Sequence, residues 1–243
     1  EIATGGGMFP PAVRTLMQGQ HPRLRAPVEA RYPCAILVDV AGEAEDRLEG
    51  EALRQREPRR DATAVTIVQM QPHPTGTRYL VQDRRWWTGV PHYQLYAAIA
   101  RLAEVWSAAQ VLVDATGVGA GLASFLKRAL GERLVPVQFT AGIKSELGWG
   151  FLGLCQCGRY IEYAPDGADD TAQFWREVAA ADYVVGSGPN QPMRWGVADP
   201  AIHDDLLLSA ALCALLERDA AGQHEGSRLV EASDPLEAHD DAT

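Results

Sequence analysis

Two apolar segments of the chain end alike, each with an aspartate. Asp39 follows Leu37-Val38, and Asp114 follows Leu112-Val113. An ionised carboxylate next to an apolar strand is costly unless a cation or several hydrogen-bond donors compensate it. If the two segments are neighbouring parallel strands, both carboxylates lie at the same edge of one sheet. A turn or a helix cap explains either aspartate alone equally well, whereas the matching pair favours a shared chemical role.

A third acidic position, Asp204-Asp205, opens an apolar segment near the end of the chain. Aspartate is common where a helix begins, because its carboxylate caps free backbone N–H groups and interacts favourably with the helix dipole. Capping therefore accounts well for one of the two residues. The second acid is left over for another role.

Three carboxylate positions brought together would repel one another strongly without a counter-charge. Hard divalent cations that prefer oxygen ligands, Mg²⁺ or Mn²⁺, are the natural compensation. Two such ions roughly 4 Å apart clamp the attacking water and the leaving oxygen of a phosphodiester during in-line displacement. The acids therefore predict metal-assisted phosphodiester hydrolysis.

The spacing of apolar residues predicts the elements that would position these acids. Short apolar or β-branched runs predict strands over residues 35–40, 62–69, 77–82, 111–114 and 134–139. Apolar residues at helical spacing predict helices over residues 91–106 and 118–130. The first three strands form an antiparallel meander, and the later alternation of strand and helix requires parallel strands with right-handed crossovers. We therefore predict an α/β fold with a mixed β-sheet flanked by helices.

The later part of the chain predicts further helices and one added β-hairpin. Helices are expected over residues 144–156 and 171–181. Residues 183–197 place glycine, proline and asparagine between two strand-like runs, which predicts a projecting hairpin. Residues 204–216 are apolar almost all the way round, as expected for a helix packed into the core.

The two ends of the chain differ in composition from its middle. Residues 1–30 contain a glycine triplet and several prolines with little periodicity, which predicts an N-terminal arm or linker rather than core. Residues 218–243 are acidic and almost free of large apolar residues, which predicts a disordered tail. Residues 31–217 are expected to form one domain.

The composition excludes some classes of protein and leaves others open. The chain has 243 residues, 47% of them hydrophobic, and four cysteines, too few for a disulfide scaffold. No stretch approaches the roughly 18 consecutive apolar residues of a membrane span. The formal net charge is −10, but eight acids and two arginines of that balance lie in residues 217–243. Overall charge therefore neither supports nor excludes a polyanionic partner.

The order of strands, helices and acids resembles that of the ribonuclease H-like nucleases, and in particular the C-terminal nuclease domain of the large terminase subunit of tailed bacteriophages. The resemblance rests on residues 37–43, 60–68, 113–119, 144–146 and 203–207. Each motif is short, but the motifs occur in the order of that family over residues 6–217.

The resemblance implies a DNA endonuclease that cuts concatemeric viral DNA during genome packaging. Asp39 matches the first-strand metal ligand, Asp114 the fourth-strand ligand, and Asp204 or Asp205 the late-helix ligand of a site for two Mg²⁺ or Mn²⁺ ions. Asp61 matches an acid where the second strand begins, and we treat it as a candidate that supports the ligands rather than one of them.

Positive charge for a DNA contact occurs in three places. Arg59 and Arg60 lie between the first two predicted strands, and Arg84 and Arg85 follow the third and precede Trp86-Trp87; these arginines could hold phosphates. Lys144 is the better candidate for a phosphate contact, because the resemblance includes it. Trp86-Trp87 could stack on unpaired bases, but packing inside the domain is the favoured interpretation.

The implied partners are double-stranded DNA, a terminase ATPase domain, the terminase small subunit and the portal protein, in the cytoplasm of an infected bacterial host. The chain has no G-x-x-x-x-G-K-[ST] loop, so it resembles the nuclease half without the motor. Two alternatives stay open. One is another ribonuclease H-like enzyme, such as a resolvase or a transposase core, and the other is a catalytically silent interaction domain whose acids are caps and turns.

Overall fold

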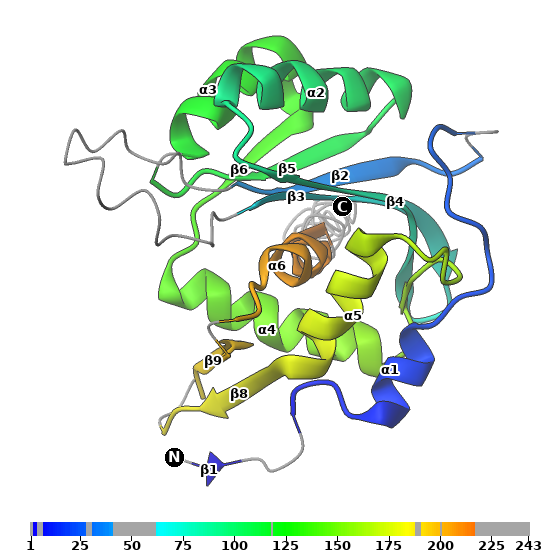
Figure 1. Cartoon of the computed structure of the whole chain (residues 1–243), viewed down its shortest axis with the longest axis vertical. Coiled ribbons are helices and arrows are strands. Elements are labelled where there is room, and N and C mark those ends of the chain that lie inside the picture. Colours follow the sequence, from blue (N-terminus) through cyan, green and yellow to red (C-terminus); the bar gives the residue numbers. More distant parts are fainter. Residues whose placement is uncertain are drawn as a thin grey trace, which may run out of the picture.

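The computed structural model describes residues 2–3, 7–27, 31–40, 62–117, 119–187, 191–199 and 201–216. These residues form three layers (Figure 1). Helices α2 (His92–Val105) and α3 (Gly119–Leu130) cover one face of a central β-sheet. Helices α4 (Ala141–Gln156), α5 (Asp169–Ala180) and α6 (Asp205–Ala211) cover the other face.

The central sheet is mixed, with the strand order β6-β5-β2-β3-β4-β7. Its strands are β2 (Cys34–Asp39), β3 (Ala62–His73), β4 (Gly76–Thr88), β5 (Gln110–Asp114), β6 (Leu134–Val137) and β7 (Tyr160–Ile161). The pairs β2–β3 and β3–β4 are antiparallel, whereas β2–β5 and β5–β6 are parallel. The predicted meander and the predicted parallel portion are therefore both confirmed.

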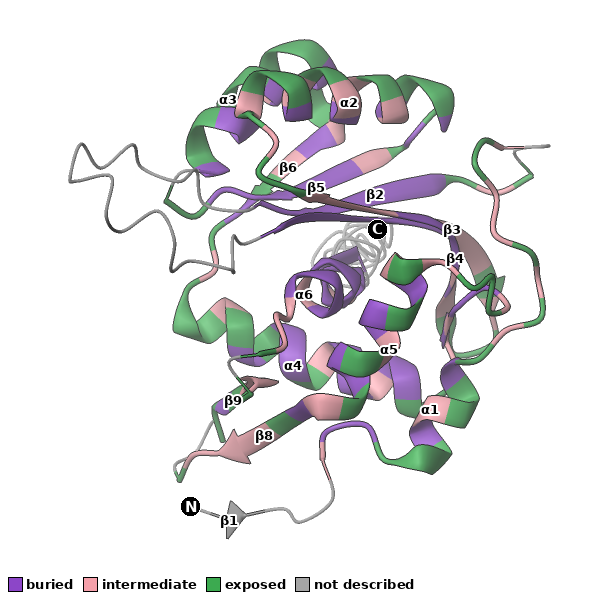
Figure 2. Cartoon of the chain, viewed as in Figure 1, coloured by how far each residue is buried: buried purple, intermediate pink, exposed green. Residues whose placement is uncertain are grey.

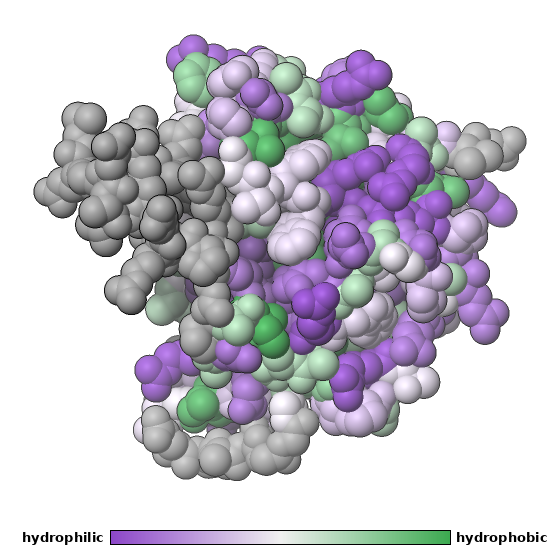
Figure 3. Space-filling view, in the orientation of Figure 1, coloured by the Kyte–Doolittle hydropathy of each residue, from purple (hydrophilic) through white to green (hydrophobic). Residues whose placement is uncertain are grey.

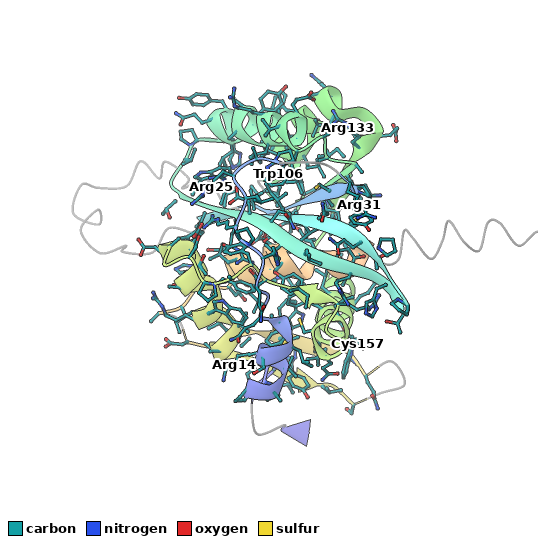
Figure 4. The ribbon with its side chains drawn as sticks, turned by 90° about the vertical axis from the view of Figure 1, so that its right-hand side faces the viewer. Arg14, Arg25, Arg31, Trp106, Arg133 and Cys157 are labelled. Carbon is teal, nitrogen blue, oxygen red and sulfur yellow. The ribbon has the colours of Figure 1, made fainter. Side chains whose placement is uncertain are left out.

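The face under α2 and α3 is covered by a continuous apolar cluster. Alternate residues of β2, including Ile36 and Val38, pack against the apolar stripes of the two helices. Trp106, at the end of α2, is drawn between the helix layer and the sheet in Figure 4 and is buried. The stripes that predicted these helices from their spacing are the surfaces that they bury.

The opposite face carries α6 at its centre. Figure 2 shows α6 buried on all sides, between the sheet and helices α4 and α5. The Ser209 hydroxyl lies 3.0 Å from the Leu37 carbonyl oxygen, to which it donates, and 2.8 Å from the Thr66 hydroxyl. These contacts hold the helix against β2 and β3, and the prediction of a core helix is confirmed.

The first part of the chain differs from its predicted character of an arm or linker. Residues 11–17 form α1 (Pro11–Met17), and Met8, Phe9, Val13 and Met17 are buried in the cluster beside α4 and α5. The backbone N–H of Glu162 donates to the Met17 carbonyl oxygen at 2.7 Å. The prediction is therefore wrong for residues 7–27, because their few apolar residues complete a core made by later elements.

A network of partly buried ion pairs also ties this segment to the domain. The Arg23 guanidinium lies 2.7 Å from Asp83 of β4 and 2.7 Å from Asp170 of α5. Burial raises the pKa of Asp170, but its hydrogen bond and ion pair with Arg23 outweigh burial and lower that pKa below its ordinary value. Figure 3 shows hydrophilic residues gathered where residues 18–27 run beside β4.

A second, small sheet packs against α4. It joins β1 (Ile2–Ala3), β8 (Ala181–Val185) and β9 (Met193–Val197), with β8 and β9 antiparallel. The predicted added hairpin is thus confirmed as β8–β9. Within the described part of the chain, helices are too short or too polar to cross a membrane.

We predict that Gly148→Ala weakens the contact between the hairpin and α4. A Cβ at this position would lie 2.4 Å from the Trp195 ring and 2.6 Å from the Met193 sulfur. We expect the free energy of unfolding to fall by about 1–3 kcal/mol, as for other overpacked sites. Gly153→Ala is the control in the same helix, because a Cβ there meets no atom within 4 Å. The control is expected to gain roughly 0.5–1 kcal/mol in denaturant unfolding, and equal effects would contradict the prediction.

Candidate active site

Asp39 and Asp114 lie at the same edge of the sheet. They are the last residues of the parallel neighbours β2 and β5, in which Val38 pairs with Val113. Asp39 alternates with Leu37, so its side chain lies on the face that α6 covers. Both residues are less than one-tenth exposed. The condition stated from the sequence, that the two segments be neighbouring parallel strands, is met, and the two carboxylates share one edge.

The turn after β5 fixes the position of Asp114. Its carboxylate accepts a hydrogen bond from the Thr116 backbone N–H at 2.8 Å, so the turn role considered for this residue is real. Gly119 begins α3 so close to the strand that a Cβ would lie 2.4 Å from the Asp114 carbonyl oxygen. The glycine-rich turn therefore serves close packing of helix on strand.

The first turn of α6 brings the third acidic position to these strand ends. Asp205 is buried, and its carboxylate accepts a hydrogen bond from the Ala62 backbone N–H at 3.2 Å, where β3 begins. Asp204 is partly exposed, and its Oδ2 atom lies 2.8 Å from the place that a Cβ of Gly196 would occupy. Asp204 is the N-cap of α6 but makes no side-chain capping bond. The capping role considered for it is therefore not observed.

The pKa of Asp39 shows that Asp114, Asp204 and Asp205 lie near it. Burial raises the pKa of Asp39 well above its ordinary value, and the charges of Asp205, Asp114 and Asp204 raise it further. Burial also raises the pKa of Asp114, although its hydrogen bonds from Thr116 oppose this shift. The edge of the sheet thus gathers more negative charge than the protein around it compensates.

Lys144 supplies positive charge to this edge from α4. It lies exposed in the first turn of that helix, and its charge lowers the pKa of both Asp39 and Asp114. The Thr140 hydroxyl caps α4 by accepting a hydrogen bond from Ile143, and the Trp195 indole donates to the Lys144 carbonyl oxygen at 2.6 Å. The lysine is therefore placed beside the acids from a helix fixed at its start.

Glu177 is a buried acid near the site that sequence reasoning missed. It lies on α5, and its Oε2 atom accepts a hydrogen bond from the Leu207 backbone N–H in the first turn of α6 at 2.9 Å. Gln173 donates to the other oxygen at 3.1 Å. Burial raises the pKa of Glu177 to about 8. The available signal was an acid on the apolar stripe of an amphipathic helix, three residues after Phe174.

The prediction that Arg84 contacts DNA is wrong. Its side chain is fully buried, and its guanidinium group lies 2.7 Å from the Glu162 carboxylate. The guanidinium carbon lies over the Phe174 ring, 3.7 Å from the ring centre. Arg84 sits on the α6 face of β4, where a buried arginine needs an acidic partner and is inaccessible to a phosphate. Arg84 therefore links β4 to β7 and α5 inside the core.

Arg85 lies on the opposite face of the sheet from Asp39. Trp86 is in line with Asp39 through Ala64, and successive side chains of a strand alternate between faces. The Arg85 guanidinium is also held 2.6 Å from Asp83. The position of Arg85 does not support a contact with DNA at this site, and that contact stays a prediction. Asp61, Arg59 and Arg60 lie outside the described residues.

The site offers the right kind of ligand for a hard divalent cation. Carboxylate oxygens are the ligands that Mg²⁺ and Mn²⁺ prefer, and a cation would relieve the repulsion that raises the pKa of Asp39. Over the described residues, however, no three His, Cys, Asp or Glu side chains converge closely enough to hold one ion as they stand.

Solved structures similar to this chain include large terminases of phages and their nuclease domains. The large terminase nuclease from thermophilic phage G20c with bound cobalt matches with a TM-score of 0.62 at 16% identity, over 87% of this chain and 98% of that chain. The same nuclease with bound magnesium matches with a TM-score of 0.61 at 17% identity, with the same coverage. The large terminase of bacteriophage HK97 matches with a TM-score of 0.58 at 13% identity, over 87% of this chain and 44% of that chain.

No protein-family model and no curated protein matches the sequence. At 13–17% identity the structural matches show the fold. The chain has the mixed-sheet, ribonuclease H-like fold of large terminase nuclease domains, which confirms the fold implied by the resemblance.

We predict that metal-free protein becomes less stable as the pH rises from about 5 to 8. The folded state raises the pKa of Glu177 from 4.5 to about 8 and that of Asp39 in the same direction. Across this window the folded chain retains protons that the unfolded chain has released. Ionisation therefore favours unfolding, by about 1.4 kcal/mol for each tenfold difference in proton affinity between the two states. The pKa of Asp170 is lowered, so its effect on the free energy of unfolding changes only at a more acid pH than this window.

Thermal unfolding in EDTA across this pH range tests the prediction. Glu177→Gln cannot ionise at this position, so its melting temperature is expected to fall less steeply than that of the unmodified chain. A melting temperature that rises with pH between 5 and 8 would contradict the prediction.

Proposed function

We propose, for a chain with the fold of large terminase nuclease domains, that it is a metal-dependent DNA endonuclease that cuts concatemeric viral DNA during genome packaging. The observation that carries this proposal is the approach of four carboxylates at one sheet edge. Asp39 and Asp114 end neighbouring parallel strands, and Asp204 and Asp205 open the helix packed against them.

The proposed cofactor is a pair of Mg²⁺ or Mn²⁺ ions held by Asp39, by Asp114 and by Asp204 or Asp205. When bound, such ions generate a nucleophilic water and stabilise the departing oxygen of a phosphodiester. The similar G20c nuclease has been crystallised with bound magnesium and with bound cobalt. The hard oxygen donors of this chain and their unrelieved repulsion are consistent with the same kind of ion.

The remaining residues of the site would act on the DNA itself. Lys144 is exposed beside Asp39 and Asp114, and in the proposed complex it would pair with a phosphate of the strand being cut. Asp39 and Asp114 are largely inaccessible to bulk water, and charge interactions are stronger where water is excluded. The chain's own groups thereby orient the phosphodiester over the acids.

The proposed partners are those of a large terminase nuclease domain. The substrate is double-stranded DNA in the cytoplasm of an infected bacterial host. The match to HK97 large terminase covers 44% of that protein, which is consistent with a nuclease half that works beside an ATPase domain. The terminase small subunit and the portal protein are proposed as further partners on the resemblance alone.

A second candidate function is a catalytically silent interaction domain. Two observations favour it: the Asp114 and Asp205 carboxylates already accept backbone hydrogen bonds from Thr116 and Ala62. In addition, no three potential ligands converge among the residues the structure describes. The two candidates differ in whether the carboxylates take up a divalent metal.

We predict that Asp39→Ala and Asp114→Ala abolish cleavage of supercoiled plasmid in Mn²⁺ or Mg²⁺. The melting temperature of each variant is expected to be unchanged or raised, because removal of one carboxylate relieves repulsion. Asp182→Asn is the control, since Asp182 is an exposed acid on β8 that accepts a bond from Tyr183. Cleavage by either alanine variant at the unmodified rate would remove the assignment. A strong preference for four-way junctions would instead favour a resolvase.

We further predict that Mn²⁺ raises the melting temperature of the unmodified chain. A ligand at 100 times its dissociation constant stabilises the folded state by about 2.7 kcal/mol. Asp39→Asn keeps the size of the side chain but removes the charge, so its shift in differential scanning fluorimetry is expected to be largely lost. No shift in the unmodified chain would favour the silent domain.

A further inference from the structure

The first turn of α6 is capped by a residue of another helix. Leu207 is the third residue of α6, and its backbone N–H is one of the four at a helix start that have no partner within the helix. Glu177 of α5, thirty residues earlier, accepts this hydrogen bond at 2.9 Å. The Glu177 side chain is completely buried.

Asp204 is the residue expected to make this bond. An N-cap aspartate ordinarily accepts a hydrogen bond from the second or third N–H of its helix. The backbone of Asp204, at φ −116° and ψ 17°, is not in the extended conformation usual for that bond, and its side chain makes no capping bond. Its carboxylate instead lies near Gly196 and raises the pKa of Asp39.

We propose that Glu177 is a positioning residue for the acids of the proposed metal centre. By accepting the Leu207 N–H, it leaves the Asp204 carboxylate free to face Asp39 and fixes the turn that carries Asp205. This role rests on the proposed function, because it concerns the metal affinity of that same site.

The surroundings of Glu177 make it suited to this role. Gln173, one turn earlier on α5, donates to its second oxygen at 3.1 Å and fixes the orientation of the carboxyl group. Phe174 and Val178 anchor the same face of α5 in the core. Without Glu177, the buried Leu207 N–H would lack a partner, and the nearest way to supply one is for Asp204 to turn back as the cap. That turn withdraws an acid from the site.

The experiment compares three variants of the full chain for Mn²⁺ binding by titration calorimetry and for plasmid cleavage across Mn²⁺ concentrations. Glu177→Met keeps the length and burial of the side chain but removes both acceptor oxygens. Glu177→Gln retains an oxygen for the Leu207 N–H. Ser209→Ala removes the contacts of α6 with Leu37 and Thr66 and leaves the cap intact.

We expect Glu177→Met to raise both the Mn²⁺ dissociation constant and the half-saturating Mn²⁺ concentration for cleavage by about 10- to 100-fold, as for other residues that orient metal ligands. Saturating Mn²⁺ is expected to restore most of the cleavage rate. Glu177→Gln is expected to stay within about threefold of the unmodified chain, since it keeps the capping bond. Ser209→Ala is expected to lower the melting temperature without moving the Mn²⁺ requirement.

Apart from loss of folding, three results would overturn the proposal. The first is a folded Glu177→Met variant with the Mn²⁺ requirement of the unmodified chain. The second is a Ser209→Ala variant with an equally raised requirement, because any loosening of α6 would then suffice. The third is an unmodified chain that neither binds Mn²⁺ nor cleaves DNA, which overturns the proposed function and this role together. In the first two cases the unmodified chain is active, so the two failures are distinguishable.

A second variant guards against loss of folding. If Glu177→Met is unfolded at the assay temperature, Glu177→Ala is measured in the same way, with the same expected rise in the Mn²⁺ requirement. If neither variant folds, Glu177 acts on the stability of the whole domain, and the positioning role is overturned.

Discussion

The arrangement of this protein depends on one unfavourable interaction, the repulsion among carboxylates held at a single edge of the sheet. Asp39 is nearly inaccessible to water, and the charges of Asp205, Asp114 and Asp204 act on it together. Like charges in a medium of low dielectric do not gather unless the surrounding structure forces them to. The packing of the domain therefore supplies the free energy that keeps the acids together.

Two features of the packing do this. The parallel pairing of β2 with β5 places Asp39 beside Asp114, and the hydrogen bond from Leu207 to Glu177 ties the first turn of α6 to α5. In the core, by contrast, the buried charge of Arg84 is matched by that of Glu162. The contrast between this matched pair and the repelling carboxylates at the sheet edge supports the proposal of a cation at that edge.

Much of the fold could be predicted from the sequence, because local periodicity determines which face of a strand or helix is buried. The apolar runs before Asp39 and Asp114 indicated strands, and the later alternation of strand and helix indicated a parallel portion of the sheet. The shared sheet edge of the two aspartates was expected only if their strands were neighbours, and the pairing of β2 with β5 in the folded chain meets that condition. The added hairpin and the buried helix after Asp205 were equally visible, since turn residues and an all-apolar surface are local signals.

The tertiary structure alone decided the roles of residues whose partners lie far away in the chain. Arg84 and Arg85 are adjacent, but Glu162, seventy-eight residues later, makes one of them part of the core. Residues 7–27 lack a periodic pattern, yet they complete a core built by later helices. The sequence determined that Asp204 and Asp205 begin a helix, but Glu177 leaves Asp204 without its usual capping bond. Local pattern determines which surfaces are buried, whereas hydrogen-bond and charge partners are set when distant segments pack together, because each buried polar group must then find a partner.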